Sequence, residues 1–283
     1  MSRDEPIPPR LTVLLAREAK TGVIFRRGPS ELVGVYGWNR KTDEVREAQW
    51  FQGRIDVDRS DLSPDGRHMI YFASKNGEPW TAVSRAPYIK ALDFMPQDDH
   101  HGGGGHFVDN RTYVHDPSPF LPGGTNEEML PADYVAPANR FRSGLTRIVR
   151  ALPSGQHQND FYPKFSRDGW DAMGTWKGAY PHARHTWERP FVRGWRLRRN
   201  INAVAKPRRG KGVHYATHAL VPREGEVVER LDWEWADIAD DRLFWCANGC
   251  LLRGSVEAAL GEREPKLIHD FRGDRFKPLE APY

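Results

Sequence analysis

The stretch that decides the fold is DLSPDGRHMIYF, Asp61–Phe72. A short apolar segment runs into Ser-Pro-Asp-Gly, where Pro64 and Gly66 favour a tight turn with a positive φ angle at the glycine. Branched and aromatic residues follow, which is typical of a second strand. The stretch therefore predicts a β-hairpin centred near residue 65.

The same pattern recurs four times along the chain. The copies are FYPKFSRDGW (Phe161–Trp170), HFVDNRTYV (His106–Val114), WADIADDRLFW (Trp235–Trp245) and the most divergent one, Leu11–Phe25. Their turns centre near residues 20, 65, 109, 168 and 241, which gives spacings of about 45, 44, 59 and 73 residues. The first two spacings match a four-stranded propeller blade. The longer two require insertions, for which the Pro/Gly-rich stretch 116–142 and Ala203–Gly212 are candidates.

Ser63–Arg67 with its following aromatic strand resembles the blade signature of TolB-like β-propeller repeats, which are related to WD-type repeats. Ser166–Gly169 is similar but lacks the proline. The resemblance covers short stretches of five blades and implies architecture only. Such repeats occur in binding scaffolds and in enzymes, so no catalytic residue is carried over.

We therefore predict an all-β protein: one β-propeller domain over residues 1–283, built from five four-stranded blades. The blades lie at about 10–52, 53–96, 97–153, 154–222 and 223–275. The predicted strands begin with the inner strand of the first blade and end with the outer strand of the fifth. The first blade is thus expected to pack against the last, without terminal strand exchange.

Strands are least distinct in the third and fourth blades. Thr146–Leu152 is expected as the last strand of blade three, although its apolar residues also fit a helical face. A short helix is expected at Ser255–Leu260. The strands expected in blade four are Tyr162–Phe165, Asp171–Trp176, Pro190–Arg198 and His214–Val221.

Composition, charge and cysteine content argue against several classes of function. The chain has 39% hydrophobic residues, 32 aromatic ones (10 Trp, 9 Tyr and 13 Phe) and a net charge of +4, as expected for a globular protein. Its densest basic stretch, Arg193–Arg209, is interpreted as a solvated surface, so nucleic acid is an unlikely partner. Cys246 and Cys250 cannot form a four-thiolate zinc site. No apolar run reaches the length of a membrane span, and we expect a cytoplasmic monomer.

The predicted functional face is the channel mouth, where loops enter the innermost strands and converge. Four such loops carry carboxylates and imidazoles, and aromatic residues lie beside them. The candidate binding residues are Asp56, Asp58, Asp61, Asp98, His100, His101, His106, His157, Asp160, Tyr162, Asp232, Trp233, Trp235 and Asp237.

Three stretches suggest narrower sites. His100, His101 and His106 flank a glycine run and are weak metal candidates, so no metal or other cofactor is predicted. Asp56–Asp61 fails the EF-hand pattern because its glycine and closing glutamate are missing, which favours an Asx turn. Carboxylates of the mouth could form the pair that glycoside hydrolysis requires.

The functional prediction is a binding module that holds a protein partner or a small polar ligand at the channel mouth. The alternative is a carbohydrate-active enzyme with paired carboxylates in the same channel. The third hypothesis is nucleic-acid binding through Arg193–Arg209.

Overall fold

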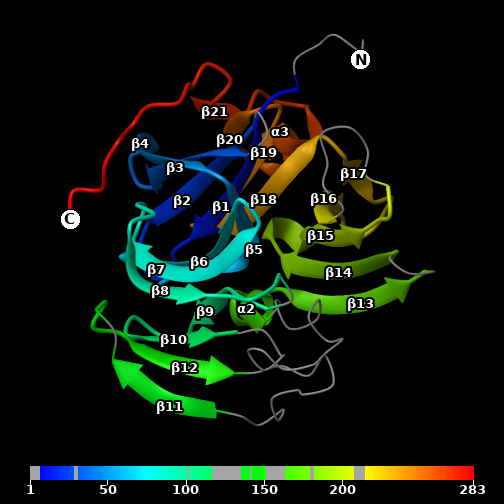
Figure 1. Ribbon diagram of the computed structural model, residues 1–283. Coiled ribbons are helices and arrows are strands. Elements are labelled where there is room, and N and C mark those ends of the chain that lie inside the picture. The colour runs from blue at the N-terminus through cyan, green and yellow to red at the C-terminus, as the bar shows by residue number, and fades with distance from the viewer. Residues whose placement is uncertain are drawn as a thin grey trace. The chain divides into compact units, whose positions relative to one another are not determined.

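The computed structural model describes residues 7–28, 31–100, 102–116, 135–140, 142–150, 163–178, 182–206 and 214–283. The fold is all-β, as predicted, and most of its sheets are four-stranded and antiparallel (Figure 1). The chain divides into two compact units. The first unit comprises the residues up to Thr12 together with Phe165–Asp274, and the second comprises Val13–Lys164 and Arg275–Tyr283.

Sheets of the first two predicted blades are antiparallel meanders. One has the order β1 (Arg10–Leu15), β2 (Thr21–Arg27), β3 (Leu32–Asn39) and β4 (Glu44–Gln52). The next has the order β5 (Arg54–Leu62), β6 (His68–Lys75), β7 (Glu78–Arg85) and β8 (Ala91–Pro96). Their eight strands fall within the ranges 10–52 and 53–96 expected for the first two blades.

The third sheet departs from the meander. Its order is β11 (Val135–Arg140), β12 (Thr146–Arg150), β10 (Thr112–His115) and β9 (Gly105–Phe107), and β12 runs parallel to β10. The described part of the predicted strand Thr146–Leu152, Thr146–Arg150, is therefore a strand of this sheet; residues 151 and 152 lie outside the described residues. The expected position of this strand at the outer edge was wrong. That position belongs to β11, which comes from the stretch predicted to be an insertion.

The fourth sheet has five strands: β13 (Asp171–Lys177), β14 (Ala183–Pro190), β15 (Arg196–Ala203), β16 (His214–Val221) and β17 (Val228–Arg230). The fifth is a four-stranded meander of β18 (Trp233–Ala239), β19 (Arg242–Ala247), β20 (Cys250–Gly254) and β21 (Lys266–Asp270). The expected helix is α3 (Val256–Leu260), which Ser255 caps by accepting a bond from the Ala258 amide at 3.4 Å.

Blade four was predicted incorrectly in two places. The expected inner strand Tyr162–Phe165 is instead the start of a short helix, α2 (Pro163–Arg167), as far as it is described; Gly169, with φ +84°, follows the helix. The SRDG tetrad thus ends a helix rather than turning a hairpin. The expected strand Pro190–Arg198 is interrupted by a 3-10 turn, η1 (Val192–Gly194), in which Arg193 has φ 54°.

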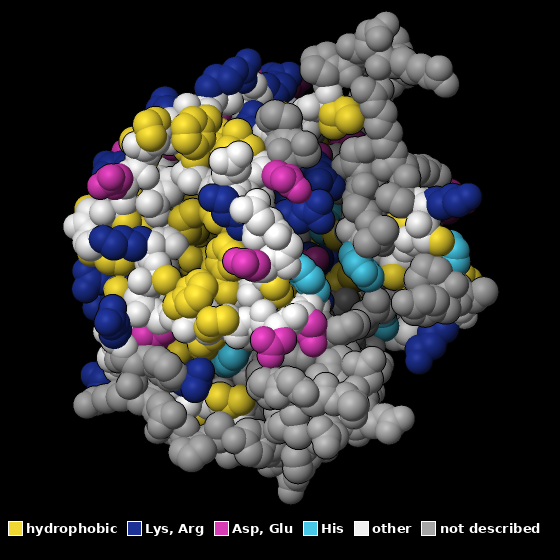
Figure 2. Space-filling model, in the orientation of Figure 1, with side chains coloured by type: hydrophobic (Ala, Val, Ile, Leu, Met, Phe, Trp, Pro, Cys, Tyr) yellow, Lys and Arg dark blue, Asp and Glu magenta, His cyan; other side chains and the backbone are white. Residues whose placement is uncertain are grey.

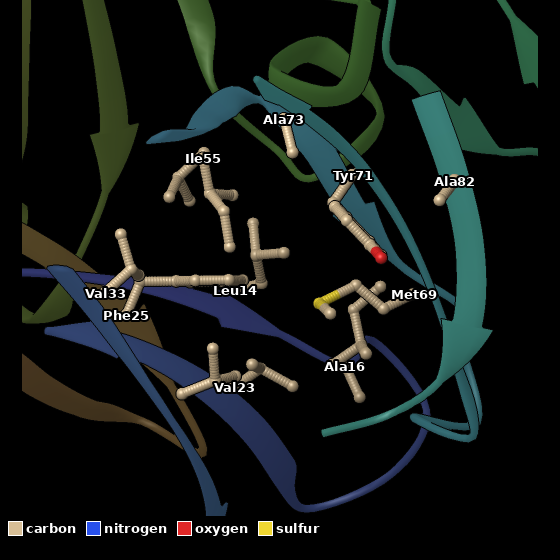
Figure 3. Packing of buried hydrophobic residues seen from close by; sticks show 13 residues of the cluster. Leu14, Ala16, Val23, Phe25, Val33, Ile55, Met69, Tyr71, Ala73 and Ala82 are labelled. Carbon is tan, nitrogen blue, oxygen red and sulfur yellow. The ribbon is translucent and has the colours of Figure 1, made fainter. Parts of the chain in front are cut away.

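Sheets of the second unit pack face to face through alternating side chains. On β6, Met69 and Tyr71 belong to a core shared with Phe25 and Leu14 of the first sheet (Figure 3). The intervening Ile70 belongs to a second core cluster, which includes Phe107, Tyr113 and Leu145 from the third sheet and its flanking loop. One strand therefore joins both interfaces, and three consecutive sheets pack in chain order.

The hairpin turns of these three sheets form a turn cluster, defined as residues 16–20, 63–67 and 109–111. The Glu18 amide donates to the Pro64 carbonyl at 2.9 Å, and the Asp65 amide donates to the side-chain oxygen of Asn110 at 2.7 Å. The Asn110 side chain in turn donates to Glu18 at 2.9 Å. The repeated acidic turns therefore hold neighbouring sheets together.

Gly66 in this turn cluster has φ +72°, as the sequence predicted, and a Cβ there would overlap the Thr21 hydroxyl. Gly66→Val should lower the free energy of unfolding by about 2 kcal/mol, through backbone strain plus this overlap. The matched control is Gly144→Val, because Gly144 has φ +73° with open space around it. Urea denaturation should show a smaller loss of unfolding free energy in the control. Equal losses in the two variants would mean that the overlap with Thr21 does not contribute.

Candidate functional site

Strand β5 carries a long bulge. Asp56 pairs with Phe72 and Asp61 with Ile70, so the four residues Val57–Ser60 lie opposite one residue of β6. Asp56 organises the bulge: its carboxylate accepts the amides of Asp58 at 3.1 Å and Arg59 at 3.4 Å. These are the bonds of an Asx turn, as the sequence predicted for this stretch.

The ammonium group of Lys164 is hydrogen-bonded to the backbone of the bulge. Its Nζ donates to the carbonyl oxygens of Asp58 at 2.6 Å, Ser60 at 2.9 Å and Val57 at 3.4 Å, and its side chain is buried. Carbonyls that leave a strand ladder need new donors when they are buried. Lys164 therefore fixes the bulged backbone in one conformation.

Arg59 joins the bulge to the loop that enters the third sheet. Its guanidinium donates to the carbonyls of His100 at 2.8 Å and Gly102 at 2.7 Å, and it lies 4.9 Å from the ring centroid of Phe72. Gly104, with φ +88°, donates its amide to the Thr81 hydroxyl at 2.7 Å. The loop is thus bonded to two strands of the second sheet.

We call the resulting group the entry cluster: Asp56, Asp58, Arg59, Asp98, Asp99, His100 and Lys164. Asp98 and His100 are exposed, while Asp56, Asp58 and Asp99 are half-buried. Lys164 and Arg59 donate to main-chain carbonyls, and Arg59 also pairs with Asp56 at 3.4 Å. The cluster nevertheless holds more carboxylates than cationic side chains, and the carboxylate of Asp98 is the exposed one. An acidic rim on a firmly bonded backbone favours cationic ligand groups.

Beside this cluster lies an aromatic patch, formed by Phe51, Trp80 and Phe94. The rings of Phe51 and Trp80 are 5.8 Å apart, as are those of Trp80 and Phe94, and Phe94 is 56% exposed. The loop of the entry cluster begins next to it, because the Gln97 amide donates to the Pro79 carbonyl at 3.0 Å. Figure 2 shows hydrophobic side chains gathered over the region of β6–β8.

Two other predicted binding residues of the second unit, Asp61 and His106, do not belong to the entry cluster. Asp61 is buried and accepts the Phe107 amide at 2.8 Å, which ties β5 to β9. His106 is half-buried on β9. The remaining candidates of this unit, His101, His157, Asp160 and Tyr162, lie outside the described residues.

Predicted residues of the first unit are used in packing and ion pairs. Trp233 and Trp235 are buried, and Trp233 stacks on Trp245 with ring centroids 5.1 Å apart, so neither ring offers a face to a ligand. Asp232 pairs with Arg230 at 3.4 Å. Asp237 pairs with Arg189 at 2.6 Å, while burial raises the pKa of its carboxyl group. These contacts give no support to paired catalytic carboxylates in this unit.

The described arginines of the basic stretch Arg193–Arg209 contact other side chains of the protein. Arg196 contacts Glu188 at 2.8 Å and Asp171 at 2.5 Å, and Arg198 contacts Glu188 at 2.7 Å. Arg199 is buried, with its guanidinium 4.9 Å from the Phe165 ring centroid. Within the described part of this segment, Arg196 and Arg198 are therefore paired with acidic side chains of their own sheet.

Metal ligation gains no support in the part of the chain that the structure describes, where no three histidine, cysteine or acidic side chains gather as a metal site would require. Both cysteines are free, and burial raises the pKa of the Cys246 thiol. Within the same described ranges, no helix has the length and apolarity needed to cross a membrane.

Sequence reasoning missed a buried histidine, His115, that contacts Gln97 next to the entry cluster. His115 is 4% exposed, its Nε2 lies 3.0 Å from the Gln97 side-chain nitrogen, and burial lowers its pKa to about 3, with a further contribution from Arg147. Its place in an apolar strand, Thr112–His115, gave no sign of this environment. The imidazole is therefore neutral in the folded protein near neutral pH.

This burial predicts acid sensitivity. The unfolded chain takes up a proton at His115 near pH 6.5 and the folded chain does so only near pH 3, so stability is lost as the pH falls between these values. At pH 5 the loss should be about 2 kcal/mol. His115→Gln should flatten the profile measured by denaturation at successive pH values, whereas the exposed His182→Gln should not. An unchanged slope in His115→Gln would contradict the assignment.

Comparison with known proteins leaves the family open. No protein-family model matches the chain, and no curated protein matches it. Among solved structures it is similar to an acylaminoacyl peptidase determined in complex with Z-Gly-Gly-Phe-chloromethyl ketone, at 10% sequence identity and a TM-score of 0.31. The match covers 88% of this chain and 45% of the peptidase chain, so this chain spans less than half of its length. Similarity at this level carries no argument about function.

Proposed function

We propose that the chain is a TolB-like β-propeller that acts as a binding module. In this proposal the five sheets are the five predicted blades, and the ring closes without terminal strand exchange. The proposal is supported by the chain-order packing of three consecutive sheets and by the turn cluster that links their first hairpins. Both features are expected of neighbouring propeller blades.

The binding face we propose is the entry cluster together with the aromatic patch. The observation that carries the proposal is the double anchoring of its backbone, by Lys164 at the bulge and by Arg59 at the loop. A rim that is held in place before binding loses little conformational entropy when a ligand docks. Its carboxylates would bind cationic groups.

Protein partners fit this face better than a small polar ligand alone. Exposed aromatic side chains beside a charged rim are the usual anchors of protein interfaces. Phe94 and Trp80 would supply apolar contact, while Asp58 and Asp98 would pair with lysine or arginine of the partner. A small polar ligand would be bound by the carboxylates alone, without use of the aromatic side chains.

Fluorescence anisotropy can test this with two labelled peptides of equal length, one alternating lysine with leucine and one alternating glutamate with leucine. We expect binding of the lysine peptide only, weakened at least about tenfold by Asp58→Asn combined with Asp98→Asn. The control is Glu78→Gln, an exposed carboxylate at the start of β7. Equal binding of both peptides, or equal affinity in all variants, would rule out this face.

A further inference from the structure

The segment Arg275–Tyr283, which we call the tail, lies on the surface of the second unit, far in sequence from the strands that it contacts (Figure 1). It forms neither helix nor strand, and seven of its nine residues are exposed. Pro278 and Pro282 lack the amide donors that strand pairing requires. The tail is therefore held against the unit by its side chains and is not built into a sheet.

The beginning of the tail contacts strand β4. The Lys277 ammonium group pairs with the Glu47 carboxylate at 2.6 Å, and the rings of Phe276 and Trp50 lie 6.2 Å apart in an edge-to-face arrangement. The Trp50 indole N–H donates to Glu47 at 2.5 Å and so orients the carboxylate. This end of the tail is thus recognised by one negative charge and one aromatic ring.

Gln49 contacts the middle of the tail. Its side-chain amide nitrogen donates to the Leu279 carbonyl at 3.4 Å, and its side-chain oxygen accepts the Ile89 amide at 2.8 Å. One glutamine therefore links the tail and β4 to the connection between β7 and β8. Leu279 itself is exposed, so the middle of the tail is bound mainly through its backbone.

The end of the tail is held at the connection between β7 and β8. The Tyr283 hydroxyl donates to the Lys90 carbonyl at 2.7 Å and accepts the Arg85 amide at 3.1 Å. Its ring centroid lies 5.0 Å from the Arg85 guanidinium, 5.6 Å from the Lys90 ammonium group and 6.1 Å from the Tyr88 ring. Both the hydroxyl and the π-face of this tyrosine are recognised, the latter by two cations.

These contacts are those of a bound linear peptide: side-chain anchors near its two ends, an exposed middle, and a surface whose charges complement the segment. We call the surface the tail seat; its residues are Glu47, Gln49, Trp50, Arg85, Tyr88 and Lys90. We propose that the tail seat is a docking site for a linear peptide of a partner protein, with a lysine followed six residues later by a tyrosine and prolines between them. The tail of this chain occupies the seat as an internal competitor.

The tail seat is separate from the proposed binding face, although both involve the β7–β8 hairpin. Trp80 of the aromatic patch lies near the start of β7 and Phe94 near the end of β8, whereas Arg85 ends β7 and Lys90 precedes β8. The two sites therefore lie at opposite ends of this hairpin. The inference does not depend on the proposed function.

Fluorescence anisotropy tests the inference with a labelled peptide of residues 276–283, FKPLEAPY. In the wild-type chain the tethered tail competes at an effective concentration of about 1 mM, so the peptide should bind weakly. Tyr283→Ala in the chain removes an anchor of the tail and leaves the seat intact, so the affinity for the peptide should rise at least about tenfold. The control Glu262→Lys, in the exposed turn after α3, should bind as weakly as the wild type.

Exchange of the charge pair provides the decisive result. A second peptide carries Lys277→Glu, and the chain with Tyr283→Ala should prefer the original peptide by about fivefold. Adding Glu47→Lys to that chain should reverse the preference, because opposite charges then meet only in the second complex. A reversal also shows that the double variant is folded, since misfolding would weaken both complexes alike.

A Tyr283→Ala chain that binds the peptide no better than the wild type would overturn the inference, as would equal affinity of the double variant for the two peptides. Asp58→Asn combined with Asp98→Asn, added to the Tyr283→Ala chain, should leave the affinity for the original peptide unchanged. A loss of affinity there would assign the peptide to the entry cluster and would also overturn the inference.

Discussion

Lys164→Met should lower the free energy of unfolding by about 4 kcal/mol. The side chain is buried, and its ammonium group donates to three carbonyls of the β5 bulge at 2.6, 2.9 and 3.4 Å. Methionine has a similar length but donates no hydrogen bond, so these carbonyls lose their charged donor. Urea denaturation measures the loss, and the proposed lysine-peptide binding should weaken with it as the rim loses its anchor.

The control for this variant is Lys75→Met, at the exposed end of β6. It removes the same charge without affecting the bulge and should change stability by less than about 0.5 kcal/mol. If Lys164→Met were as stable as Lys75→Met, the Lys164 contacts would not hold the bulge.

Gly104→Ala should cost about 3 kcal/mol. Gly104 has φ +88°, and a Cβ there would overlap the carbonyl oxygen of Arg59. Backbone strain and the steric overlap act together, because neither the loop nor β5 can move without breaking the bonds that Arg59 makes to the loop. Thermal or urea unfolding measures the loss.

Gly77→Ala separates these two contributions. Gly77 has the same φ angle of +88°, in the hairpin between β6 and β7, and a Cβ there meets no atom within 4 Å. It should lose about 1 kcal/mol from strain alone. A similar loss of unfolding free energy in both variants would mean that the close approach to Arg59 does not contribute to stability.

Strands and turns with strong local patterns could be predicted from the sequence. The SPDG turn at Ser63–Gly66 joins two strands as predicted, and the strands of the first, second and fifth sheets fall within the ranges 10–52, 53–96 and 223–275. Blade four was not, since the polar strand Ala183–Pro190 lacks the apolar alternation that would identify it. The parallel pairing of β12 with β10 arises from a long-range contact that no local pattern encodes.

The candidate site was only partly predictable. Loop position alone brought Asp56, Asp58, Asp98 and His100 into the candidate set. The side chains that anchor them, Arg59 and Lys164, were missed because their partners are backbone carbonyls distant in sequence. Trp233 and Trp235 are buried, which the sequence did not indicate, because exposure of a tryptophan depends on which elements cover it and not on its neighbours in sequence.

The turn cluster has a consequence for exchange of amide protons with solvent. Amides in surface turns ordinarily exchange rapidly, yet those of Glu18, Ala19 and Asp65 bond to a turn of a neighbouring sheet. Their protons can exchange only when two sheets separate, so they report on a larger opening event than their surface position suggests. In this protein the slowest-exchanging turns should therefore mark the seams between sheets, and loss of their protection would be an early sign that neighbouring sheets have parted.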